Sequence, residues 1–172
     1  MCDSENCRHL SRRGFATLAL GAAGASVLPL RASAAGTVEA LAMTCIDYRL
    51  VDDSVKFFDS MHLTNQYDIT ALAGASLAAV SPKFPSSNAA FWDHVGIAKQ
   101  LHHIKKVIVV DHRDCGAYKV AFGAQFAGEK AAETAQHKGV MLQVQALLKQ
   151  KHPDLGSEFY LMALDGTAER VV

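Results

Sequence analysis

Short apolar segments alternate with longer helical ones along this 172-residue chain, and this alternation constrains its fold more than any other feature. Four segments are short, apolar and bounded by polar or turn residues, as buried strands are. They are TVEALAMTC (37–45), YDITALA (67–73), KKVIVVD (105–111) and EFYLMAL (158–164). The helical segments lie between them, over 51–62, 88–103, 116–127 and 131–150, and SPKFPSSN (81–88) is the one loop of note. Such alternation predicts a single α/β domain, a mostly parallel β-sheet flanked by helices.

The first 34 residues have the features of a segment that is removed from the mature protein. Arg12 and Arg13 precede a moderately apolar stretch rich in Ala and Gly, and Ala32-Ser33-Ala34 offers small residues for cleavage. A membrane-anchoring or amphipathic helix is the alternative, but Gly and Pro interrupt the apolar run, which is shorter than the ~20 residues a membrane span needs. We predict a twin-arginine signal peptide over 1–34, a folded domain over 35–172, and a periplasmic or secreted protein without a membrane anchor.

Charge and cysteine content narrow the possible partners. The chain has 17 basic and 17 acidic residues, and this balance argues against nucleic acid, whose binding needs clustered Lys and Arg. Cys2 and Cys7 leave with the signal peptide, so the mature chain keeps Cys45 and Cys115. In an oxidising compartment such a pair is first interpreted as a disulfide. Metal binding is the interpretation that competes with it.

The segment TCIDYRL (44–50) follows the first predicted strand and places reactive side chains at alternate positions. If the strand continued, Cys45, Asp47 and Arg49 would point to the same face, because residues two apart on a strand share a face. A simpler interpretation is a buried cysteine beside an exposed ion pair of little energetic value. The choice depends on what else lies against that face.

The segment VIVVDHRDCGAYK (107–119) places His112 and Cys115 directly after a buried strand, with Gly116 opening the next helix. Sites in open parallel sheets form beyond the carboxyl ends of the strands. His-x-x-Cys lets an imidazole and a sulfur converge on one ion, and the helix N-terminus favours the thiolate. Cys45 would be a third ligand if the first and third strands are neighbours. Two thiolates and one imidazole suit Zn²⁺, with a fourth position left for water or a carboxylate.

Taken together, CIDYR and HRDCG resemble the β-class carbonic anhydrases, which have a Cys-x-Asp-x-Arg motif after the first core strand and a His-x-x-Cys-Gly motif after a later one. LAGASLA after the second strand and FYLMALDGTAERV near the end fit the order of that family. The resemblance implies one Zn²⁺ per chain, bound by Cys45, His112 and Cys115. It also implies a catalytic dyad of Asp47 and Arg49, with Asp47 as a possible fourth ligand in a closed state.

The implied reaction is the reversible hydration of carbon dioxide to bicarbonate by a zinc-bound hydroxide. The implied assembly is a homodimer or a multiple of dimers. Two departures bear on the substrate: Arg113 follows the metal-binding His, where the family usually has Ser or Thr, and Ala71-Leu72 replaces a common Arg-Asn pair. Both are expected near the pocket, so carbonyl sulfide and carbon disulfide remain alternative substrates.

Two interpretations from other classes remain. A non-catalytic zinc-binding protein would keep the three ligands, but it would have no need of Asp47 and Arg49. A thiol redox protein would use Cys45 and Cys115 as a pair, but it would not need His112 and would normally have a Cys-x-x-Cys motif. Metal content distinguishes the redox protein from the enzyme, and activity towards carbon dioxide distinguishes the non-catalytic protein.

Overall fold

The computed structural model describes residues 36–123 and 129–172. The chain divides into two units, Met1–Ala34 and Ala35–Val172, and every described residue belongs to the second. The predicted signal peptide therefore lies outside the described residues. Within those residues, no helix combines the length and the apolar character that crossing a membrane requires.

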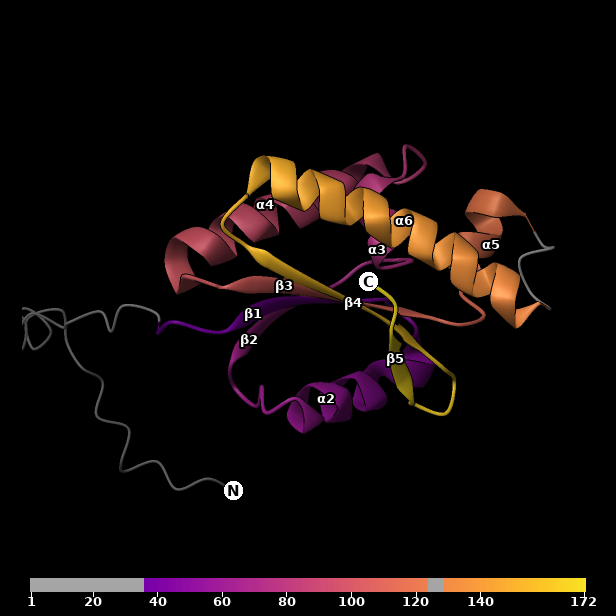
Figure 1. Cartoon of the computed structure of the whole chain (residues 1–172), viewed down its shortest axis with the longest axis horizontal. Helices are drawn as coiled ribbons and strands as arrows, with labels where there is room; N and C mark the ends of the chain where they lie inside the picture. The colour runs from indigo at the N-terminus through magenta and orange to yellow at the C-terminus, as the bar shows by residue number, and fades with distance from the viewer. Residues whose placement is uncertain (1–35, 124–128) are drawn as a thin grey trace, which may run out of the picture. The chain divides into compact units, whose positions relative to one another are not determined.

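One five-stranded sheet forms the centre of the second unit, with the strand order β2-β1-β3-β4-β5 (Figure 1). Its strands are β1 (Ala40–Thr44), β2 (Tyr67–Ala71), β3 (Lys106–His112), β4 (Gly156–Met162) and β5 (Ala168–Arg170). The first four strands pair in parallel, and β5 runs antiparallel to β4. The predicted α/β fold with a mostly parallel sheet is confirmed.

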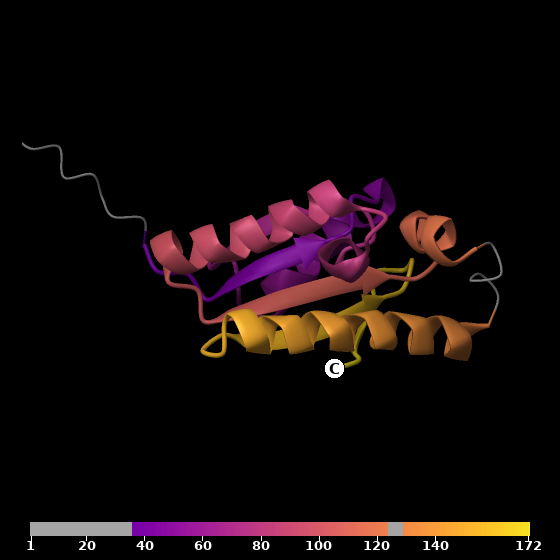
Figure 2. The same ribbon diagram turned by 90° about the horizontal axis from the view of Figure 1, so that it is seen from above.

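Helices cover both faces of this sheet (Figures 1 and 2). The long helices α4 (Pro85–His102) and α6 (Lys130–Lys151) lie on one face together with the short helix α3 (Ser76–Val80), and α2 (Val51–Ser60) lies on the other. The 3-10 helix η2 (Tyr48–Leu50) leads into α2, and α5 (Gly116–Phe122) follows β3. The central strands β1 and β3 are thus buried on both faces, which explains why their sequences are continuous apolar runs.

Alternate residues of each central strand enter different parts of the core. Leu41 and Met43 of β1 belong to the cluster that packs beneath α4 and α6, whereas Ala40 and Ala42 face Phe58 of α2. Residues of β3 alternate in the same way, since successive side chains of a strand point to opposite faces. The small alanines of β1 leave room for the large ring of Phe58, which is fully buried.

The structure corrects several predicted boundaries. Helix α4 begins at Pro85, inside the segment predicted as a loop, because proline is well suited to the first turn of a helix. Helix α5 ends at Phe122, and part of the predicted helix 116–127 lies outside the described residues. Three short elements were not predicted at all: η2, α3 and β5.

The apolar stripe predicted for the last helix faces the core, since Val140, Val144 and Leu148 are buried and Leu147 is partly buried. Leu148 is 1% exposed and Leu142, on the same helix, is 45% exposed. We expect Leu148→Ala to lower the free energy of unfolding by about 2–5 kcal/mol, because it removes buried apolar surface and leaves a cavity. Leu142→Ala, the matched control, should cost less than about 1 kcal/mol. Urea denaturation of both variants tests this, and equal losses would contradict the packing described.

Candidate metal centre

The two predicted motifs meet because β1 and β3 are adjacent and parallel. Thr44, the last residue of β1, pairs with Val110 of β3, and β3 continues for two more residues to His112. Cys45 and the turn 112–115 therefore leave the sheet at the same edge. The ligand atoms of Cys45, His112 and Cys115 all lie within 4.8 Å of one another, which a single metal ion can span. The structure confirms that the first and third predicted strands are neighbours.

Both cysteines are free thiols, so the disulfide interpretation does not describe this structure. Their Sγ atoms lie 4.0 Å apart, with Cys115 buried and Cys45 partly buried. The hydrogen bond with Cys115 lowers the pKa of Cys45 to about 4 and raises the pKa of Cys115. One thiolate is therefore available for a metal at neutral pH, and metal binding would displace the second proton.

The His112 ring is oriented to offer one nitrogen to a metal. Its Nδ1 lies 2.8 Å from the backbone oxygen of Arg113, so this nitrogen carries the proton and donates. Its Nε2 is buried and has no hydrogen-bond partner. A buried nitrogen lone pair without a donor is costly, and a metal ion held with the two sulfurs would satisfy it. The donor set of two sulfurs and one imidazole nitrogen thus fits a zinc-type ion.

Gly74 supplies a backbone contact to the cluster that the sequence pattern did not reveal. Its N–H donates to Cys45 Sγ at 3.3 Å and contributes to the lowered pKa of that thiol. Gly74 has φ +81°, and a Cβ there would lie 3.1 Å from the Cβ atoms of both Ala117 and Leu77. Only glycine combines this conformation with such a close approach. The Gly/Ala-rich segment after β2 therefore has a defined role beside the sulfur.

Asp47 and Arg49 also meet at this edge, but not on a strand. The strand does not continue to Arg49, because β1 ends at Thr44 and Asp47 caps the helix η2 that contains Arg49. Asp47 Oδ1 accepts from the Arg49 backbone N–H at 3.0 Å and from Nε at 2.9 Å, and Oδ2 accepts from Nη2 at 2.7 Å. These bonds lower the pKa of Asp47 to about 2. The carboxylate is ionised at neutral pH.

The Asp47 carboxylate lies beside the candidate metal-binding cluster of Cys45, His112 and Cys115. Its Oδ2 is 3.6 Å from His112 Nε2. A small cavity of about 10 Å³ adjoins both residues, and Cys45, Leu50 and Ser54 also line it. This volume holds about one water molecule. The site therefore combines three metal-ligand atoms, an ionised carboxylate and room for a very small molecule.

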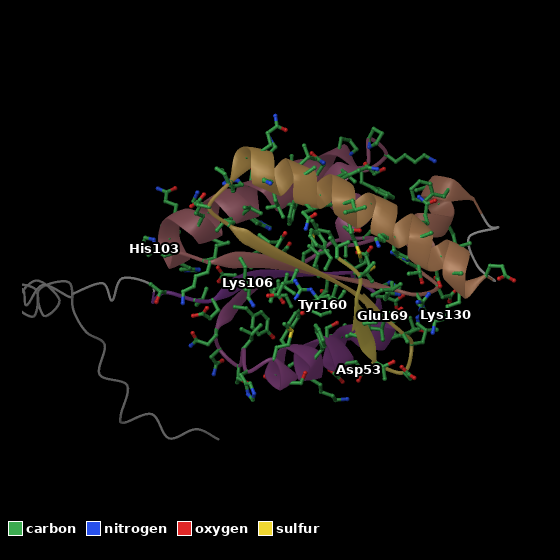
Figure 3. The ribbon with its side chains drawn as sticks, in the orientation of Figure 1. Asp53, His103, Lys106, Lys130, Tyr160 and Glu169 are labelled. Carbon is green, nitrogen blue, oxygen red and sulfur yellow. The ribbon has the colours of Figure 1, made fainter. Side chains whose placement is uncertain are left out.

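Arg113 does not line this cavity, although sequence reasoning placed it near the expected pocket. Its guanidinium pairs with Glu133 of α6 at 3.0 Å and with Glu169 of β5 at 2.6 Å. It also donates to the backbone oxygen of Lys130, and Figure 3 shows Glu169 and Lys130 at the same end of the sheet. The second departure from the family pattern is Ala71-Leu72. Ala71 is exposed at the end of β2, and Leu72 packs against the main core.

Sequence reasoning also missed the buried carboxylate of Asp111, the residue directly before His112. Asp111 is 1% exposed and accepts hydrogen bonds from the backbone N–H and hydroxyl of Ser76, the hydroxyl of Tyr118 and Nδ1 of His137, all at 2.6–2.8 Å. These donors belong to α3, α5 and α6. Asp111 therefore fixes three helices to the strand end that carries His112. A polar residue at the end of an apolar strand was its only sequence signal.

Comparisons with known proteins show the family to which this chain belongs. The family described as "Putative carbonic anhydrase" matches residues 36–153. Uncharacterized proteins of Rickettsia conorii and Rickettsia bellii are each 35% identical over 131 residues, which is 76% of this chain and 70% and 80% of theirs. Among solved structures, the β-carbonic anhydrase CafD of Aspergillus fumigatus matches with a TM-score of 0.52 and 12% identity over 84% of this chain and 94% of that one, a likeness of fold. From the family match and the relatives, this chain belongs to the "Putative carbonic anhydrase" family.

Proposed function

We propose that this protein is a zinc-dependent carbonic anhydrase that hydrates carbon dioxide reversibly to bicarbonate. The observation that carries the proposal is the convergence of two thiols and the unpartnered His112 Nε2 beside an ionised carboxylate held by Arg49. Cys45, His112 and Cys115 would hold the ion. A bound Zn²⁺ acts as a Lewis acid that makes water a competent nucleophile near neutral pH.

The remaining groups have roles that follow from their contacts. The Asp47 carboxylate is ionised and can accept the hydrogen of the attacking water, which orients the lone pair of that water towards the substrate. Arg49 binds both oxygens of Asp47 and fixes their direction. The Gly74 N–H stabilises negative charge on Cys45 Sγ. The small cavity favours a substrate of very few atoms.

Asp47 could also close the site, as the resemblance implies. Its Oδ2 lies 3.6 Å from His112 Nε2, so a small movement would bring it to the position of a fourth ligand. The bonds to Arg49 oppose this movement. Carbonyl sulfide and carbon disulfide remain alternative substrates, and because Arg113 pairs with Glu133 and Glu169, it gives no reason to prefer them to carbon dioxide.

Export and assembly are part of the proposal. Arg12-Arg13 and the small residues at 32–34 support a twin-arginine signal over 1–34 and a periplasmic or secreted location. We also keep assembly as a homodimer or a multiple of dimers, on the evidence of the family resemblance.

The first prediction from this proposal concerns metal content. We expect purified protein to contain about one Zn²⁺ per chain and Cys45→Ser, His112→Ala and Cys115→Ser to lose most of it, because each variant removes one of three ligands. His94→Gln is the control, since His94 forms a hydrogen bond with Thr70 and lies outside the cluster. Elemental analysis measures the metal. Wild-type protein without zinc would end the proposal.

The second prediction concerns the dyad. Arg49→Ala should keep the zinc but lose at least about tenfold in carbon dioxide hydration, because Asp47 would be free to occupy the open coordination position. Lys56→Ala is a matched control that also removes a cation paired with a nearby aspartate, Asp53. Stopped-flow assays with carbon dioxide, repeated with carbonyl sulfide and carbon disulfide, measure the effect. Full activity of Arg49→Ala would show that Arg49 does not control Asp47, and activity only on the sulfur compounds would reassign the substrate.

The third prediction links export to the metal. The twin-arginine route carries folded proteins, so the chain would bind zinc in the cytoplasm and cross the membrane with both thiols ligated. Replacing Arg12-Arg13 by Lys-Lys should leave active, zinc-loaded protein in the cytoplasm. Cell fractionation followed by zinc analysis tests this. Unchanged export of the Lys-Lys variant would contradict the signal assignment without affecting the metal site.

A further inference from the structure

Arg49 is held by two carboxylates, and the second belongs to the residue directly before Cys115. Nε and Nη2 of Arg49 bind Asp47, while Nη1 donates to Asp114 Oδ2 at 3.1 Å and Nη2 lies 3.4 Å from the Asp114 backbone oxygen. We propose that Asp114 is a positioning residue that anchors Arg49 and thereby keeps Asp47 away from the metal position. This inference rests on the proposed metal site of Cys45, His112 and Cys115.

The backbone of Asp114 is fixed independently of its side chain. Asp114 has φ +57°, and its N–H donates to Glu133 Oε1 at 2.6 Å. Glu133 is 8% exposed, and its other oxygen accepts from Arg113 Nη1 at 3.0 Å. Arg113, which departs from the family pattern, thus acts through Glu133 on the turn that carries Asp114. The carboxylate of Asp114 is therefore presented to Arg49 from a rigid turn.

The side-chain charges agree with this arrangement. Lys119 of α5 pairs with Asp114 Oδ1, which leaves Oδ2 for Arg49. Each of the two carboxylate oxygens of Asp114 thus contacts a different cationic side chain. The Asp114 side chain is 41% exposed and that of Arg49 is 33% exposed. A pair this exposed adds little to stability, so its effect is to place the guanidinium.

The placement matters because Asp47 and Arg49 lie in the same short segment, the helix η2 and its N-cap. If Asp114 did not hold Arg49, the bonded pair of Asp47 and Arg49 could move together, since only Tyr48 lies between them. Asp47 Oδ2 is already 3.6 Å from His112 Nε2. Asp114 is 65 residues away from Arg49 in the sequence and lies in the turn that follows β3, so its bond fixes the guanidinium relative to β3.

The test measures how readily a small anion binds to the metal in the site. Cobalt(II) replaces zinc in the full mature protein, and thiocyanate, a small anion that binds an open metal position, is titrated by visible absorption. Asp114→Gly removes the carboxylate and tolerates the positive φ. We expect unchanged metal stoichiometry and thiocyanate affinity reduced by about fivefold or more, because Asp47 competes for the open position. Asp154→Gly is the matched control, as it removes another exposed aspartate paired with a lysine.

A second variant and a second measurement separate positioning from damage to the fold. Asp114→Asn keeps the backbone conformation and one acceptor oxygen, so its loss of thiocyanate affinity should be smaller. In carbon dioxide hydration, both variants should raise KM while kcat is kept, because only the open fraction of the enzyme binds substrate. Thiocyanate affinity that is unchanged or increased in both variants, or wild-type protein that binds no thiocyanate, would overturn the proposal. A cobalt protein with the expected thiocyanate response but no hydration activity would refute the proposed function alone.

Discussion

The parallel pairing of β1 with β3 is the contact on which the candidate metal centre depends. Adjacent strands lie about 4.8 Å apart, so the ends of β1 and β3 bring Cys45 to the turn that carries His112 and Cys115. One intervening strand would double this separation and put the two sulfurs beyond the reach of a single ion. The strand order therefore decides whether two distant motifs form one site.

Two buried carboxylates, those of Asp111 and Glu133, fix the end of β3 and the turn that follows it. The buried Asp111 carboxylate receives four hydrogen bonds and joins α3, α5 and α6 to the end of β3. Glu133, also buried, links Arg113 to the backbone of the turn 112–115. Buried carboxylates are tolerated only when their acceptor capacity is filled, so these residues impose geometry on the strand end as well as stability.

Much of the fold followed from periodicity. Four strands and four helices were predicted near their observed positions, because a strand buried on both faces and an amphipathic helix have recognisable patterns. The helices η2 and α3 and the strand β5 were missed, since three to five residues are too few to show a period. The same limit applies to Asp47 and Arg49: their alternate spacing is compatible with a strand, whereas the chain turns into η2 after Thr44.

The sequence by itself determined the class of the fold and the identity of the side chains in the candidate metal-binding cluster, because strand periods and the Cys-x-Asp-x-Arg and His-x-x-Cys motifs are local patterns. Only the tertiary structure decided which groups surround them. Gly74 donates to Cys45 across 29 residues, and Asp114 reaches Arg49 across 65. The Arg113 side chain points towards Glu133 and Glu169, which lie on α6 and β5 and pair with its guanidinium. Such partners are set by strand order and helix packing, which no short stretch of sequence encodes.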